Sequence, residues 1–342
     1  MKAVLFKEHG GIDRLQYTDA PEPAIGDEDV LIDVKACSVN RLDVWVRQGI
    51  PAYTIPLPHI TGSDVAGVVA KVGARVSGVK AGERVIASPG ISCFACAWCA
   101  AGDDNLCDHF QIRGAQVDGG YAQLAAARGR DILPLPSRLT FEQGAAFPLV
   151  FLTAWHMLIT RCGLRAGQTV LVLAAGSGIG SAAIQVAQLA GARVLATVGS
   201  DAKIAKAKAL GAADVINYTR EDFAVQARKL TGGRGVDVVF EHVGPATWDK
   251  SVKALAKGGR VVTCGSTTGP TAECDLRYVF SRQLSVLGSI MGTRAELLTV
   301  TRLMGEGTLQ PVIDTVFPLR EASAAHERLL ARDHFGKFVL AP

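Results

Sequence analysis

Four of the eight cysteines in this 342-residue chain fall within fifteen residues of one another. They are spaced C-x2-C-x2-C-x7-C and are Cys93, Cys96, Cys99 and Cys107. Four thiolates on a short loop can surround Zn²⁺ tetrahedrally, as in structural zinc sites. Disulfides and free thiols are the alternatives, and a reducing compartment disfavours the first of them. We therefore predict one structural Zn²⁺ in the lobe formed by residues 93–107.

A glycine-rich loop, residues 174–180 (AAGSGIG), follows the strand-like run VLVL and precedes a helical stretch. Such glycines let the backbone approach a pyrophosphate, and the next helix offers free N–H groups and a positive dipole end. The third glycine comes one residue earlier than in G-x-G-x-x-G. The predicted contacts are Gly176, Ser177, Gly178, Ile179 and Gly180.

The identity of the dinucleotide depends on the end of the second strand of this region. An NAD site usually has an acidic residue there for the ribose 2′-hydroxyl, but residues 196–200 (ATVGS) contain none. Asp201 comes next, in a position to cap the following helix. Ser200 and Lys203 are suited to a 2′-phosphate, so the sequence favours NADPH over NADH.

Further cofactor contacts are expected where later strands end, because ligands of such sheets bind at the carboxyl edge. Tyr218 is placed toward the adenine, and the other candidates toward the nicotinamide. The full set is Tyr218, Val243, Gly265, Ser289, Met291 and, near the end of the chain, Lys337.

The elements that position these residues change character along the chain. Up to about residue 150, short strand-like runs such as 30–35, 67–72 and 83–87 alternate with Gly and Pro turn signals. From 169 to 288, buried strand-like runs alternate with Ala-rich helical stretches, including 180–189 and 202–210. Six such strands, at 169–173, 193–197, 215–216, 236–240, 260–263 and 285–287, predict an α/β fold with a doubly wound parallel Rossmann sheet. The tail contains one expected helix, 295–304, and returns to the first domain.

Composition excludes several classes of partner. The net charge is +4, one fifth of the residues are charged, and no Lys/Arg block occurs, so nucleic acid and anionic membranes are not expected. No apolar run reaches the length of about 18 residues that spans a bilayer. The N-terminal apolar stretch is too short for a signal peptide, and a cytoplasmic location is predicted.

The chain resembles the medium-chain dehydrogenase/reductase superfamily over nearly its whole length. Residues 67–73 (GVVAKVG) and 80–85 (KAGERV) carry the resemblance, and residues 38–47 (SVNRLDVWVR) with the glycine loop are similar to the quinone oxidoreductase branch. The resemblance implies a mainly β, GroES-like catalytic domain over 1–150, an NADP-binding Rossmann domain over 151–290, and a return over 291–342. It also implies a homodimer, or a dimer of dimers, formed through the strand at 285–287.

Zinc alcohol dehydrogenases of this superfamily hold a catalytic metal with two Cys and one His. Cys37 matches the first ligand, Ser63 stands at the histidine position beside Asp64, and Leu149 is the best match for the second Cys. His59 lies close to the motif and is a conceivable substitute. One thiolate and one carboxylate do not make a three-ligand site, so a catalytic zinc is not expected.

Reduction of a quinone or an activated C=C bond needs hydrogen-bond donors and no Lewis acid. The resemblance points to Asn40, Asp43 and Tyr53 as catalytic residues, with Asn40 as donor, Tyr53 as proton donor and Asp43 as an orienting group. The predicted function is an NADPH-dependent reductase of a small electrophile. The alternatives are an alcohol dehydrogenase with an altered zinc shell and a dinucleotide-binding sensor with little catalysis.

Overall fold

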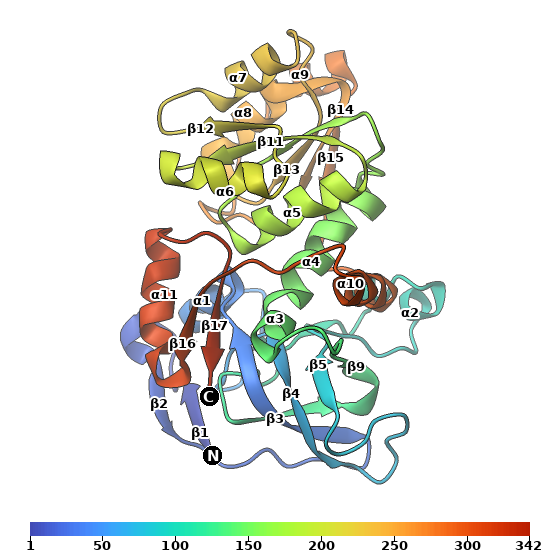
Figure 1. The fold of residues 1–342 in the computed structure, drawn as a ribbon, viewed down its shortest axis with the longest axis vertical. Coiled ribbons are helices and arrows are strands. Elements are labelled where there is room, and N and C mark those ends of the chain that lie inside the picture. Colours follow the sequence, from blue (N-terminus) through green and yellow to red (C-terminus); the bar gives the residue numbers. More distant parts are fainter. The chain divides into compact units, whose positions relative to one another are not determined.

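The computed structural model describes residues 1–342, which form two compact units. Unit 1 consists of Met1–Leu149 together with Thr293–Pro342, and unit 2 consists of Val150–Gly292. Both chain ends therefore belong to unit 1 (Figure 1). The tail rejoins the first part of the chain because its strands pair there.

Unit 1 is built on a seven-stranded sheet in which β3 is the longest strand. In spatial order the strands are β16 (Ile313–Pro318), β17 (Lys337–Ala341), β3 (Asp29–Ser38), β4 (Asp64–Val72), β5 (Arg84–Ala87) and β9 (Ile132–Pro134), with β8 (Leu124–Arg128) also paired to β3. Two small sheets join β1 (Lys2–Leu5) to β2 (Gln16–Asp19) and β6 (Gly90–Ile91) to β7 (Gln111–Ile112). Cys37 on β3 lies opposite Leu340 on β17 and Val65 on β4, so residues near these strand ends are brought together.

Short helices connect the strands of unit 1. They are α1 (Arg41–Gln48), α2 (Ala97–Ala101), α3 (Phe141–Ala146), α10 (Arg294–Glu306) and α11 (Ala322–Ala331), with the 3₁₀ turns η1 (Ile12–Arg14), η2 (Asp104–Leu106), η3 (Gly129–Asp131) and η6 (Leu319–Glu321). The expectation of a single helix in the tail was wrong. The second one, α11, buries Ala322, Ala325 and His326, a spacing of three and four residues that marks one helix face.

Unit 2 contains the predicted six-stranded parallel sheet (Figure 1). Its strands in spatial order are β12 (Asp214–Asn217), β11 (Arg193–Val198), β10 (Thr169–Val172), β13 (Val236–Glu241), β14 (Leu255–Thr263) and β15 (Ser285–Gly288). Its helical segments are α4 (Pro148–Trp155, beginning in unit 1), η4 (His156–Arg161, a π-helix), α5 (Gly178–Leu189), η5 (Asp201–Lys203), α6 (Ile204–Ala209), α7 (Phe223–Leu230), α8 (Pro245–Ala254) and α9 (Leu276–Arg282). The strand order runs outward from β10 in one direction and from β13 in the other. Right-handed crossovers then place helices on both faces and create a switch point between β10 and β13.

The strands of this sheet are buried because they are continuously apolar. All four residues of β10 are buried, and Leu171, Leu195, Val239 and Val261 belong to one core cluster. Burying one such aliphatic side chain contributes about 1.5–3 kcal/mol. The cluster therefore holds the carboxyl ends of the strands, and the loops that follow them, in fixed positions.

Three expected boundaries were wrong. Helix α5 begins at Gly178, two residues earlier than expected, because Ser177 caps it. Strand β14 begins at Leu255, well before 260. Its pairing with β13 shifts register between Leu255 and Arg260, and this irregular stretch contains Gly258, which has a φ of +72°. The stretch 202–210 is divided into η5 and α6. No helix in the chain combines the length and apolar character needed to cross a bilayer.

Candidate functional site

The four cysteine sulfurs of the lobe converge within 4.8 Å of one another. Cys93 Sγ lies 3.9 Å from Cys99 Sγ, and Cys96 Sγ lies 3.6 Å from Cys99 Sγ. Tetrahedral Zn²⁺ with Zn–S bonds of about 2.3 Å separates its sulfurs by about 3.8 Å. The lobe therefore has the donor set and the spacing for zinc.

Backbone N–H groups surround these sulfurs. Ala95 N and Cys96 N donate to Cys93 Sγ at 3.4 and 3.3 Å, and His109 N donates to Cys107 Sγ at 3.3 Å. The N–H groups of Ala95 and Cys96 lower the pKa of Cys93 to about 6. They favour the thiolate, which is the form that binds a metal.

The positions that match the catalytic zinc ligands of alcohol dehydrogenases form a different environment. A Cβ added at Gly62 would lie 2.7 Å from Cys37 Sγ, and one at Gly120 would lie 2.9 Å from it. Burial raises the pKa of Cys37 well above its ordinary value. Cys37 is thus an enclosed, neutral thiol. The four lobe cysteines are the one group of three or more His, Cys, Asp or Glu residues in the chain with the spacing of a metal site.

His59 does not offer a free ring nitrogen to this region. Its Nε2 lies 3.1 Å from Gly114 O and its Nδ1 lies 3.4 Å from Asp118 Oδ1. Burial lowers its pKa. The side chain therefore fixes the loop around residues 114–118, and the idea that it substitutes for a metal ligand finds no geometric support.

Asp64 is the centre of a buried hydrogen-bond network at the ends of β3, β4 and β17. Its Oδ2 accepts from Ser38 Oγ at 2.9 Å and Asn40 Nδ2 at 2.8 Å, and its Oδ1 accepts from Leu149 N at 2.8 Å. Lys337 Nζ lies 3.4 Å from Oδ2. Leu149, the expected match for a cysteine ligand, thus contributes its backbone N–H to a carboxylate.

Lys337 is 4% exposed and donates from Nζ to Asn40 Oδ1 at 2.5 Å. Burial lowers its pKa, and Asp64 opposes this effect. The prediction that Lys337 contacts the cofactor stays a prediction, but its observed hydrogen bonds are with Asn40 and Asp64. Sequence reasoning missed this partnership, for which the chain contains no local signal.

Asp43 organises a second network next to the first. Its carboxylate accepts from Asn40 N at 2.7 Å, Tyr121 Oη at 3.0 Å and Thr61 Oγ1 at 3.1 Å. Burial raises the pKa of Asp43 to about 6. The three donors are neutral groups, so this carboxylate holds α1 and two distant loops together.

Tyr121 extends this second network to α11. With Tyr121 donating to Asp43, the Nε2–H of His326 donates to Tyr121 Oη at 3.1 Å. Burial lowers the pKa of His326 to about 3, so its ring is neutral. Neither Tyr121 nor His326 was among the predicted residues, because nothing in the local sequence marks them.

Tyr53, the third predicted catalytic residue, lies in the turn after α1. Its N–H donates to Ile50 O at 2.9 Å, and its side chain is half-buried. Burial raises its pKa. No hydrogen bond joins Tyr53 to Asn40 or Asp43, whereas the backbone N–H of Asn40 donates to the Asp43 carboxylate. Hydrogen bonds thus join two of the three predicted catalytic residues.

The glycine loop of unit 2 lies between β10 and α5, as predicted. Ser177 Oγ donates to Ala174 O at 2.8 Å and accepts from Gly180 N at 2.9 Å. A Cβ at Gly180 would lie 2.3 Å from Ala174 O. This close approach explains why the third glycine of the loop stands one residue earlier than in G-x-G-x-x-G. The first amides of α5, at Gly178 and Ile179, have no intrahelical acceptor and are suited to a phosphate.

One side chain that was not predicted, that of Thr197, supports this region. Thr197 Oγ1 accepts from Ala174 N at 3.0 Å and thereby fixes the loop to the end of β11. Ala174 has a φ of +49°, a conformation that costs energy in a residue other than glycine and is common at functional sites.

The predicted 2′-phosphate residues follow the end of β11, with Ser200 directly before the turn η5 and Lys203 at its last position. A Cβ at Gly199 would lie 2.6 Å from Tyr218 Oη, so Tyr218 covers this strand end beside Ser200. The expectation that Asp201 caps a helix was wrong. Its carboxylate accepts from Asn217 Nδ2 at 2.7 Å and pairs with Arg220 at 2.6 Å.

The remaining predicted contacts follow β13, β14 and β15. Glu241, which was not predicted, accepts from Val243 N at 2.5 Å and from Gly244 N at 2.9 Å. Ser289 N donates to Thr263 O at 2.9 Å, while Ser289 Oγ is buried without a hydrogen-bond partner. A buried hydroxyl of this kind fits a ligand contact. Gly265 lies two residues beyond the end of β14, and Met291, after β15, has a φ of +48°.

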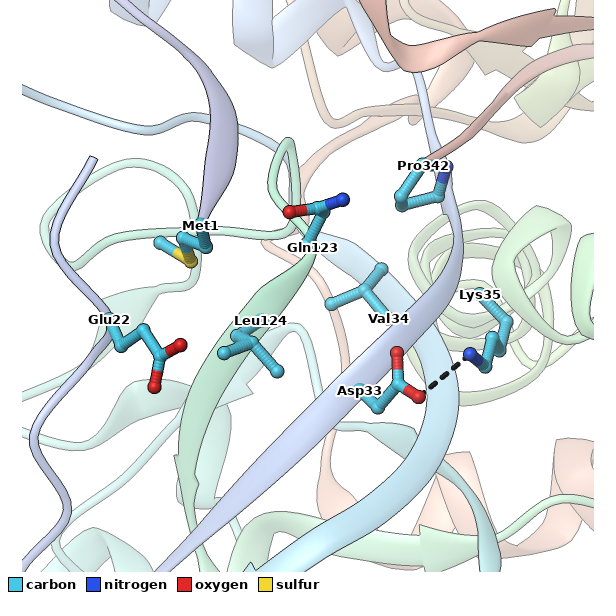
Figure 2. A pocket seen from close by; sticks show the side chains of 8 residues that line it. All are labelled: Met1, Glu22, Asp33, Val34, Lys35, Gln123, Leu124 and Pro342. Carbon is cyan, nitrogen blue, oxygen red and sulfur yellow. Dashed lines mark hydrogen bonds and ion pairs between the residues drawn. The ribbon is translucent and has the colours of Figure 1, made fainter. Parts of the chain in front are cut away.

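A separate hollow of about 360 Å³ lies on unit 1 (Figure 2). It is lined by Met1, Glu22, Asp33, Val34, Lys35, Gln123, Leu124 and Pro342. Asp33 and Lys35 pair with each other at 2.7 Å. The hollow includes none of the predicted site residues, so we do not assign the reaction to it.

Comparison with known proteins agrees with this architecture. Residues 26–137 match the family model "Alcohol dehydrogenase GroES-like domain", and residues 178–306 match "Zinc-binding dehydrogenase". Quinone oxidoreductase from Homo sapiens is 32% identical over 348 residues, covering 99% of this chain and 97% of that protein. Crotonyl-CoA carboxylase/reductase from Cereibacter sphaeroides is 32% identical over 366 residues, covering 97% and 84%. A crystal structure of an NAD-dependent alcohol dehydrogenase is 44% identical, with a TM-score of 0.96 and 100% of both chains covered.

Proposed function

Because the chain belongs to the medium-chain dehydrogenase/reductase superfamily and is an oxidoreductase, we propose that it reduces a quinone, an enone or another activated C=C or C=O substrate with NADPH. The observation that carries this proposal is the network around Asp64. Of the positions where alcohol dehydrogenases hold a catalytic zinc, Leu149 donates its backbone N–H to Asp64. Asn40 and Lys337 complete this network by hydrogen bonds to Asp64 and to each other. We therefore assign the chemistry to hydrogen-bond donors.

Bound NADPH supplies the hydride for an electrophilic carbon of the substrate. The substrate oxygen then gains negative charge, and the N–H of Asn40 that does not bond Asp64 is the proposed donor to it. One such donor is worth about 3–4 kcal/mol in a transition state. Tyr53 is the proposed proton donor, and Asp43 orients Asn40 by accepting its backbone N–H.

For the cofactor, we propose that the amides of Gly178 and Ile179 bind the pyrophosphate, that Ser200 and Lys203 bind a 2′-phosphate, and that Tyr218 lies against the adenine. The absence of an acidic residue at the end of β11 supports NADPH, although one related structure is of an NAD-dependent enzyme. Lys203→Ala is expected to raise the KM for NADPH roughly tenfold, equivalent to about 1.4 kcal/mol, and to leave the KM for NADH unchanged. Lys208→Ala, on the next helix, is the matched control, and an equal effect on both cofactors would contradict the assignment.

For the metal, we propose one structural Zn²⁺ per chain, held by Cys93, Cys96, Cys99 and Cys107. Their spacing supports it, and in this role the metal stabilises a fold without touching substrate. A cytoplasmic location, where thiols stay reduced, is part of the same proposal.

Alcohol dehydrogenase activity is the second candidate, because several related structures are of alcohol dehydrogenases. Zinc per chain, measured on protein purified without chelator or added metal, separates the two. About one zinc, with NADPH oxidation by a benzoquinone or cyclohexenone, is the expected result. About two zinc ions and alcohol-dependent NAD(P)⁺ reduction would overturn it. Tight NADPH binding without turnover of any electrophile would instead indicate a nucleotide-binding sensor.

For assembly, we propose a homodimer formed through β15, the end strand of the unit 2 sheet. An end strand presents unpaired N–H and C=O groups to a second strand. Leu276 and Phe280 on α9 are 70% and 71% exposed, and Val286 on β15 is 49% exposed. These apolar side chains are suited to a contact between two copies of the chain.

A further inference from the structure

The side-chain amide of Asn40 lies between a buried cation and a buried carboxylate. Its Oδ1 accepts from Lys337 Nζ at 2.5 Å, and its Nδ2 donates to Asp64 Oδ2 at 2.8 Å. All three side chains are buried. The amide is therefore bonded at both ends by groups of opposite charge.

This arrangement permits one orientation of the amide. Rotating it by 180° would place the NH₂ group against the ammonium and the oxygen against the carboxylate, which repel it in both cases. Asp64 is itself held by Ser38 Oγ and Leu149 N. Three strand ends and the first turn of α4 thus fix the direction of Nδ2.

The same arrangement also polarises the amide. An ammonium on the oxygen withdraws electron density from the nitrogen, and hydrogen bonds in a buried network strengthen one another. Asn40 Nδ2 carries two N–H groups, of which Asp64 occupies one. The other is left for a further acceptor.

We propose that Lys337 is a positioning residue, whose ammonium orients and polarises the Asn40 amide so that the remaining N–H donates strongly to the substrate oxygen. This inference rests on the proposed reductase function. Lys337 acts here through Asn40 and need not touch the substrate. A buried ion pair such as Lys337–Asp64 gives little net stability, and stability alone therefore does not account for a lysine at this position.

The chain contains only three asparagines, Asn40, Asn105 and Asn217, which makes the inference directly measurable. Protein labelled with ¹⁵N in the asparagine side chains gives three pairs of NH₂ signals, and Asn40→Asp identifies the Asn40 pair by its loss. In Lys337→Met we expect the Asn40 pair to shift by more than a linewidth. The Asn105 and Asn217 pairs are expected to stay in place.

Kinetics provide the second readout. Lys337→Met is expected to lower kcat for a benzoquinone or cyclohexenone roughly tenfold to hundredfold, as for the weakening of an oxyanion donor, with KM for NADPH unchanged. Lys35→Met is the matched control, because Lys35 also forms an ion pair with an aspartate, at 2.7 Å, but is exposed. If Lys337→Met alone fails to fold, Asp64→Asn/Lys337→Met is compared with Asp64→Asn alone, so that the two proteins differ only in the ammonium of Lys337.

The outcomes separate this inference from the proposed function. A shifted Asn40 pair with a lower kcat supports both. An Asn40 pair that stays in place, or a shifted pair with unchanged kcat, overturns the role of Lys337 while the reductase stands. If the wild-type protein fails to oxidise NADPH with any of the electrophiles tested, the proposed function is wrong. The catalytic use of the Asn40 amide is then wrong as well, even where the shifted signals show that Lys337 polarises this amide.

Discussion

Two buried aspartates in unit 1 meet the cost of burial in different ways. Asp64 has a cation, Lys337, within 3.4 Å in addition to its three hydrogen-bond donors. Asp43 accepts only from neutral donors, and burial raises its pKa to about 6. A buried carboxylate without a bonded cation favours its protonated form. Asp43 should therefore make folding stability depend on pH.

The sign of this dependence follows from linkage. The unfolded carboxyl has a pKa of 3.8 and the folded one a pKa of about 6, so the folded state binds more protons between these values and its stability falls as pH rises. This difference in the pKa of Asp43 corresponds to about 3 kcal/mol of folding free energy. The free energy of unfolding of wild type minus that of Asp43→Asn is expected to decrease by up to this amount from pH 4 to 6.5. Urea titrations measure it, and a difference that is constant with pH would show that Asp43 is not the group responsible.

Gly180 shows how the absence of a Cβ atom shapes the glycine loop. An added methyl group would lie 2.3 Å from Ala174 O, so Gly180→Ala must move the loop or the start of α5. We expect a loss of about 1–3 kcal/mol of stability and at least a tenfold weaker affinity for NADPH. Gly288→Ala, in the same unit, has no atom within 4 Å of the added carbon. This control should bind NADPH normally in a calorimetric titration, and equal losses in both variants would refute the steric explanation.

At the scale of elements, the cysteine lobe has almost no regular structure of its own. Its helix α2 has five residues and its turn η2 has three, and helices of this length are unstable alone. The sulfur-to-metal bonds are then expected to supply much of the local stability.

Cys99→Ser is accordingly expected to reduce zinc from about one per chain to nearly none and to lower the melting temperature. Elemental analysis and thermal unfolding check the two effects on the same sample. Cys274→Ser, which changes an isolated cysteine of unit 2, should retain its zinc. Full zinc content in the Cys99 variant would exclude Cys99 as a ligand.

At the scale of the whole molecule, the end strand β15 decides the expected assembly. A lysine in place of Val286 puts a charge in the proposed strand-to-strand contact, which is a common way of blocking sheet edges. Val286→Lys is expected to halve the mass measured by sedimentation equilibrium. Val225→Lys alters a 62% exposed valine on α7 and should not change the mass. A Val286→Lys protein that keeps the wild-type mass would place the contact elsewhere.

The convergence of the four cysteines and the place of the glycine loop between a strand and a helix could be predicted because each depends on residues close together in the chain. The four cysteines occupy residues 93–107, and the strand, loop and helix around Ser177 are consecutive. The six strands of unit 2 were also predictable, because buried parallel strands are continuously apolar. Boundaries were missed where a single cap or a register shift decided them, as at Gly178 and between Leu255 and Arg260.

The sequence by itself therefore determined the fold class, the cluster of four cysteines and the position of the glycine loop between a strand and a helix. The tertiary structure alone decided the partners of Asn40, because Lys337 is 297 residues away and Asp64 is 24 residues away. Tyr121 and His326, separated by 205 residues, meet for the same reason. Such pairs depend on the pairing of β3 with β4 and β17. Strand pairing between distant segments is set by packing of the whole core and leaves no local pattern in the chain.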